Sequence, residues 1–99
     1  MSCNRAQLCG RLETRGALRF SPAGVAMVDF TIAHHSEQQE ANASRKANCV
    51  LRAIAMETLA QKIATLPKGT LVKATGFLAQ AGRTDPGLVL HVQKIELIE

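Results

Sequence analysis

The sequence predicts an all-β fold, a five-stranded antiparallel Greek-key barrel with one short helix between its third and fourth strands. Five segments alternate apolar and polar residues, as strands do when one face is buried. A single segment instead carries apolar residues at helical spacing. Turns rich in glycine, proline and small polar residues separate these segments, so we expect short strands joined by hairpins and loops.

The chain has 99 residues, which is enough for a single domain spanning residues 1–99 with one modest core. A core of this size gains from oligomerisation, because a second copy buries more apolar surface. Only Glu99 follows the last predicted strand. We therefore expect a bare domain whose partners dock on the folded surface.

The first strand is predicted from Arg5 to Glu13, where Leu8 and Leu12 share one face. Gly10 interrupts this strand, and a residue without a side chain there suits a sharp bend or a close approach of another backbone. The turn Ser21–Gly24 is predicted to join the segment that ends near Phe20 to the next strand, as a hairpin.

The second strand is predicted from Val25 to His35 and places Phe30 in the core. The segment Ser36–Lys46 is polar, has mixed charge and lacks large apolar residues, so it is interpreted as a mobile loop. A third strand follows from Ala47 to Ala55. These boundaries rest on the change in composition.

The helix is predicted from Glu57 to Leu66, because apolar residues recur there at intervals of four and three, and Pro67–Gly69 ends it. The fourth strand covers Thr70–Ala79, and the loop 80–87 leads to the last strand, Leu88–Ile98. Alternation slips at Gln93–Lys94, which indicates a β-bulge. This order of elements is the layout of the oligonucleotide/oligosaccharide-binding (OB) barrel.

The chain is basic, with a net charge of +4 and a pI near 9.4, which favours a polyanionic partner. Charged and polar residues interrupt every apolar run well before the ~20 residues of a membrane helix, and no signal peptide is visible. We expect a cytoplasmic protein without membrane contact.

The cysteines and histidines do not predict a metal site. Cys3, Cys9 and Cys49 are odd in number and contain no CxxC pair, so Cys9 and Cys49 are interpreted as small packing residues of strands. His34 and His35 are adjacent on a strand, so their side chains point to opposite faces. We expect neither a metal nor another cofactor.

Several short motifs together resemble one family, primosomal replication protein N (PriB), among the single-stranded-DNA-binding-like OB folds. The resemblance runs nearly end to end. It is carried by Asn4-Arg5, Leu8–Leu12, Ser21–Gly24, Phe30–Ser36, Lys68-Gly69, Gly76–Leu78 and Lys94–Ile98.

This resemblance implies a homodimer, paired through strand edges, that binds single-stranded DNA and acts in the primosome when replication forks have stalled. It further implies that the protein bridges DNA, the restart helicase PriA and the next loading factor, of the DnaT type. No catalysis is implied.

Cations that could hold phosphates are the candidate nucleic-acid-binding residues. The first group is Arg19, Arg45, Lys46 and Arg83, and the second is Arg11, Arg15 and Lys73. For each of them, a solvated surface charge is the alternative. The family carries a basic loop before the last strand, whereas here Arg83 is its only cation and Asp85 nearly cancels that charge.

Flat side chains for stacking on bases are scarce, because the chain has no Trp or Tyr and only three Phe residues. Phe30 is assigned to the core, whereas Phe20 and Phe77 are more open. Ala43 and Asn48 stand near a place where the family can carry an aromatic residue. We therefore expect an electrostatic binder with little stacking.

Two other classes of protein are alternatives to a DNA-binding module. An enzyme would need a nucleophile with a base, a carboxylate pair or a phosphate-binding glycine loop, and the sequence matches none of these patterns. A protein-interaction OB module of the replication machinery, with weak or vestigial nucleic-acid binding, would use the same barrel. Glu37, Glu40 and Glu57 are then either solubilising charges or contacts for a basic partner.

Overall fold

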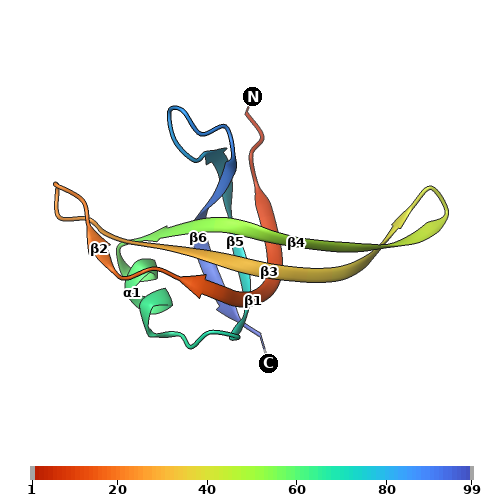
Figure 1. Cartoon of the computed structure of the whole chain (residues 1–99), viewed down its shortest axis with the longest axis horizontal. Helices are drawn as coiled ribbons and strands as arrows, with labels where there is room; N and C mark the ends of the chain where they lie inside the picture. The colour runs from red at the N-terminus through yellow and green to blue at the C-terminus, as the bar shows by residue number, and fades with distance from the viewer. Residues whose placement is uncertain (1, 99) are drawn as a thin grey trace.

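The structure, a computed structural model, describes residues 2–98. It consists of a closed barrel from which one long two-stranded arm extends, and the chain measures 50 × 35 × 25 Å along its principal axes. Figure 1 shows the arm, formed by β3 and β4, reaching far beyond the barrel along the longest axis. This confirms the predicted five-stranded OB barrel with one helix.

Every predicted strand and the helix are present, with shifted boundaries. A two-residue strand, β2, is added in the first hairpin. The elements are β1 (Ala6–Arg15), β2 (Arg19–Phe20), β3 (Ala26–Glu40), β4 (Ala43–Met56), α1 (Thr58–Thr65), β5 (Leu71–Gln80) and β6 (Leu88–Leu97).

The barrel closes because β1 pairs with two different strands. Its first half pairs with β5 from Ala6 to Arg11, and its second half pairs with β3. The change of partner occurs beside Gly10, where an added Cβ would overlap the Ala33 carbonyl oxygen and the Ile32 side chain. The predicted close approach at this glycine is thus confirmed, and β1 can bend from one part of the sheet to the other.

The remaining barrel seam differs from the antiparallel expectation. β4 and β6 pair in parallel, and only at Ala53–Leu90 and Ile54–His91. All other strand pairs are antiparallel. Because this seam is short, the two strands diverge beyond it, and the part of β4 that forms the arm does not pair with β6.

The core is built from the inward-facing residues of the strands together with one face of α1. Phe30, expected in the core, is 3% exposed, and Ala60 and Ile63 of α1 are fully buried. α1 contributes them by packing against β3, β4 and β6. The bulge expected near the chain end is also present, since Thr75 pairs with Lys94 while Gly76 pairs with Val92.

The segment 36–46 corrects the sequence interpretation, because it is a hairpin rather than a loop. β3 and β4 stay paired up to Glu40–Ala43, and only Ala41 and Asn42 form the turn. Both have positive φ, 51° and 66°, as two-residue hairpin turns require. Polar side chains cover both faces of this ladder, so no apolar alternation marks it in the sequence.

Candidate nucleic-acid interface

A groove of about 720 Å³ lies on the outer face of the barrel. It runs between the end of β1, β2, the middle of β3 and β4, and β6 with the start of the β5–β6 loop. Its ionisable side chains are Arg15, Arg19, Asp29, Arg52 and His91. The groove therefore combines guanidinium groups with one carboxylate and one imidazole.

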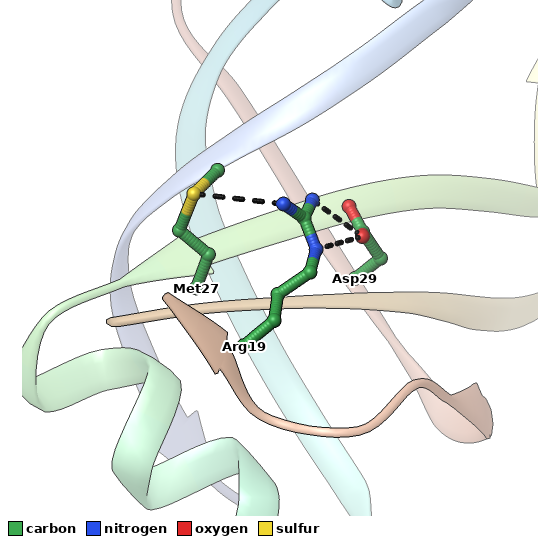
Figure 2. Close-up of polar contacts among 3 residues, drawn as sticks. All are labelled: Arg19, Met27 and Asp29. Carbon is green, nitrogen blue, oxygen red and sulfur yellow. Dashed lines mark hydrogen bonds and ion pairs between the residues drawn. The ribbon is translucent and has the colours of Figure 1, made fainter. Parts of the chain in front are cut away.

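Arg19, one of the nominated cations, lines this groove, but its guanidinium already forms an ion pair. Its Nη2 and Nε atoms lie 2.7 and 3.2 Å from Oδ2 of Asp29, and Nη1 lies 3.7 Å from the sulfur of Met27 (Figure 2). The strands fix this arrangement, because Arg19 of β2 lies directly opposite Met27 of β3 in the strand register. The carboxylate offsets the charge that Arg19 offers to a phosphate.

Arg52, which the sequence reasoning did not nominate, is the second guanidinium of the groove. Its Nη1 atom donates to Oδ2 of Asp85 at 3.0 Å, which ties the β5–β6 loop to β4. The backbone N–H of Gly87 also donates to Asp85, at 2.9 Å. These bonds, first that from Gly87 and then that from Arg52, hold the pKa of Asp85 below its ordinary value.

His91 was also missed, and it gives the groove a flat side chain. Its ring is stacked on Phe77, with centroids 4.8 Å apart and planes 6° from parallel. The two residues are directly opposite each other on β5 and β6. Phe77 is half-buried and Phe20 is 63% exposed, so both are more open than Phe30, as expected. His91 can present a ring to a base.

Arg45 and Lys46 lie on opposite faces of the arm because successive strand residues alternate. Lys46 shares a face with Arg52 of the groove and lines a smaller hollow of about 260 Å³ with His35, Asn48 and neighbouring residues. Arg45 points to the other face, where its Nε lies 2.7 Å from Oε1 of Glu40. The two cations therefore do not form one patch.

Of two more nominated cations, one lines the groove and the other lies on the β5–β6 loop. Arg15 lines the groove and donates from Nη1 to the Leu66 carbonyl at the end of α1, so this guanidinium braces the helix. Arg83 is on the exposed β5–β6 loop, and its side chain forms no ion pair with residues 2–98.

The last two nominated cations lie elsewhere, on β1 and β5 rather than at the groove. Arg11 donates to the Gly69 carbonyl at 2.9 Å. Lys73 lies 3.5 Å from Glu96, which Lys94 also approaches at 3.1 Å. The bond from Lys94 is the main reason, and Lys73 the next, that the pKa of Glu96 is lowered. The predicted set is therefore divided among several surfaces.

Cys9 and Cys49 differ from their predicted role as packing residues, since both are exposed, and Cys3 is exposed as well. Both cysteines lie on the exposed side of their strands, Cys9 on β1 and Cys49 on β4. His34 and His35 point to different faces, as expected, and contact Cys9 O and Asn48 Oδ1 respectively. Within residues 2–98, no three His, Cys, Asp or Glu side chains cluster as metal ligands would.

The two missed residues had weak signals in the sequence. Arg52 alternates with the buried Ala53, so it was visible as an outward cation on a strand. His91 likewise alternates with Leu90 and Val92, which are buried. Neither position could be assigned to the groove without the pairing of β4 with β6, which brings Ile54 beside His91.

Comparisons with known proteins agree with this architecture. A family model described as another single-strand binding protein family matches residues 4–94. Replication restart protein PriB of Nitrosomonas europaea is 36% identical over 99 residues, covering 98% of this chain and 92% of that protein. Its namesake from Photorhabdus laumondii is 36% identical over 102 residues, covering 100% and 97% of the two chains.

Solved structures give the same result. The protein PriB of Ralstonia solanacearum superposes with a TM-score of 0.89 at 28% identity, covering 99% of this chain and all of that one. The single-stranded DNA binding protein of Thermus aquaticus shares the fold, with a TM-score of 0.78 at 23% identity over 98% of this chain and 50% of its own.

The barrel and its outer groove thus define a single-strand-binding type of OB protein. Within that class, the chain belongs to the family of replication restart protein PriB. Among residues 2–98, no helix has the length and apolar character needed to cross a membrane.

Proposed function

We propose that this protein is a non-catalytic component of the replication-restart primosome that binds single-stranded DNA along the outer face of β3 and β4. The observation that carries the proposal is the groove, where Arg19, Arg52 and His91 meet. Cations that follow a strand and a flat ring at one end suit a flexible polyanion with exposed bases. Near full-length similarity to PriB proteins supports the role.

The proposed DNA path begins at the groove and continues onto the arm. Arg52 and Lys46 lie on the same face of β4, so phosphates can follow that face toward the turn of the arm. Arg83 borders the path from the β5–β6 loop. Arg11, Lys73 and Arg45 are left outside the path, on other surfaces.

Titration of a fluorescein-labelled single-stranded oligonucleotide at low salt tests this function. We expect saturable binding that weakens as salt rises, because phosphate neutralisation releases counterions. Arg52→Ala should weaken binding, whereas Lys73→Ala serves as a matched control on another surface. Binding that is equally strong to duplex DNA, or unaffected by Arg52→Ala in a folded variant, would contradict the proposed path.

The finer role concerns partners. We propose a homodimer that bridges single-stranded DNA, the PriA helicase and a DnaT-type loading factor, and work at replication forks would place it in the cytoplasm. Light scattering should then give twice the 10.6 kDa of one chain. Unwinding of a forked substrate by the helicase of the same organism should increase on adding this protein. A strictly monomeric chain, or unwinding that does not change, would contradict this role.

An alternative function is supported by one observation, the ion pairing of two of the three groove arginines, Arg19 and Arg52. Asp29 pairs with Arg19 and Asp85 pairs with Arg52, which lowers the attraction of the groove for phosphate. A protein-interaction OB module would not need a groove that attracts phosphate. In that case the oligonucleotide titration would show negligible binding at low salt, while the effect on helicase unwinding would persist.

A further inference from the structure

The carboxylate of Asp29 is an unusual neighbour for a phosphate. Both Nε and Nη2 of Arg19 bind the same oxygen, Oδ2 (Figure 2). The other oxygen, Oδ1, accepts no hydrogen bond from residues 2–98. The Asp29 side chain is 59% exposed, so Oδ1 is available to a molecule in the groove.

Arg19 also has unused donors. A guanidinium carries five N–H groups. Arg19 directs two of them at Asp29 and one at the sulfur of Met27, so two remain for a ligand. The pair therefore offers one strong acceptor beside free donors within the same groove.

This combination favours a base over a phosphate. A phosphate placed here would meet the like charge of Asp29 at close range, which is unfavourable. An N–H group of a base would instead donate to the carboxylate, and such charge-assisted hydrogen bonds are strong. His91, stacked on Phe77 and lining the same groove, supplies a flat ring for the base.

We propose that the Arg19–Asp29 pair is a base-reading subsite that prefers cytosine to thymine in single-stranded DNA. This inference rests on the proposed function, single-stranded DNA binding in the groove. Asp29 accepts from the exocyclic amino group of cytosine, as carboxylates do from C N4. The free donors of Arg19 serve the adjacent ring nitrogen and carbonyl oxygen.

Thymine does not fit the pair in the same way. It carries a carbonyl oxygen where cytosine has the amino group, so two acceptors would face each other at Asp29. A good bidentate contact discriminates by about 1–3 kcal/mol, and the half-exposed pair belongs at the lower end of this range. The expected preference is therefore about five-fold in Kd.

The test compares fluorescein-labelled oligo(dC) and oligo(dT) of equal length by anisotropy titration at one salt concentration. Wild-type protein should bind oligo(dC) about five-fold more tightly. Asp29→Asn should abolish or invert the preference, because an amide presents a donor as well as an acceptor. Oligo(dC) carrying N4,N4-dimethylcytosine should bind wild-type protein as weakly as oligo(dT), a readout that needs no variant.

Glu40→Gln is the matched control, since it removes one negative charge and frees one arginine outside the groove. It can tighten binding to both oligonucleotides, but it should leave their ratio unchanged. Equal affinities for oligo(dC) and oligo(dT), or a ratio that survives in folded Asp29→Asn, would overturn the base-reading subsite alone. Absence of binding to either oligonucleotide would overturn it together with the proposed function.

Discussion

Arg52 and Asp85 are 33 positions apart in the chain, yet the Arg52 guanidinium lies 3.0 Å from the Asp85 carboxylate. The contact joins the wall of the groove to the loop that borders it. Because Asp85 also accepts from the Gly87 N–H, one carboxylate sets both the shape of the loop and its position over β4.

The pKa of Asp85 tests this contact between the loop and β4. The carboxyl should titrate below its ordinary value of 3.8, followed by carboxyl-carbon NMR. A folded-state pKa below the unfolded value means that the stabilising contact is intact above the unfolded pKa and is lost as pH falls through the folded one. Loop amide signals should therefore shift with a midpoint below pH 3.8.

Arg52→Gln should raise the pKa of Asp85 without restoring it fully, because the bond from Gly87 remains. The pKa of Glu96, which is lowered by Lys94 and Lys73, serves as an internal control and should not move. An Asp85 pKa that is the same with and without Arg52 would show that the arginine does not hold the loop.

Lys46 and Arg45 should differ in their effect on DNA binding. Lys46→Ala removes a cation from the face that continues the groove, and we expect the slope of log K against log salt to flatten by about 0.7. Arg45→Ala should act less, since Arg45 points to the opposite face and is paired with Glu40. Salt titrations of DNA binding by both variants measure this difference. Equal losses of affinity and of salt slope would mean that DNA contacts both faces of the arm.

Gly10→Ala should destabilise the protein markedly. The added Cβ would overlap the Ala33 carbonyl and the Ile32 side chain at the bend of β1. Inserting a methyl group into a packed site costs about 1–3 kcal/mol, measured by urea unfolding. Gly82→Ala is the control, because its nearest neighbour would be 3.9 Å away. Similar midpoints for the two variants would refute the close approach.

Replacing Cys3, Cys9 and Cys49 together with Ser should preserve both stability and DNA binding. All three thiols are exposed, and exposed substitutions change the free energy of unfolding by about 0.5 kcal/mol or less. Thermal melting and elemental analysis for zinc provide the measurements. Stoichiometric zinc in the wild-type protein that is lost, together with DNA binding, in the variant would show that the cysteines bind metal.

Much of the fold was predictable because burial on one face leaves a period of two in the sequence. Phe30 and its alternating neighbours, the helix and the bulge at Gln93 were all visible in this way. The arm was not, since Glu37–Lys46 and Gln38–Arg45 pair with polar side chains on both faces. A strand without a buried face has no periodic signal to detect.

The candidate groove was less predictable than the fold. Sequence reasoning selects cations by type, but it cannot show that Asp29 pairs with Arg19 or that Lys46 and Arg45 diverge. Such relations depend on strand register and on contacts between distant segments. Arg52 and His91 become neighbours of the same groove only when β4 and β6 meet.

The double pairing of β1 also has a kinetic consequence. Its second half can join β3 early, because Arg15 and Phe30 are close in the chain. Its first half must wait for β5, since Ala6 pairs with Gly76. Distant pairings of this kind slow folding, and barrels dominated by them fold in milliseconds to seconds. During synthesis, the first half of β1 therefore keeps an unpaired edge until β5, which ends at Gln80 of the 99 residues, has left the ribosome.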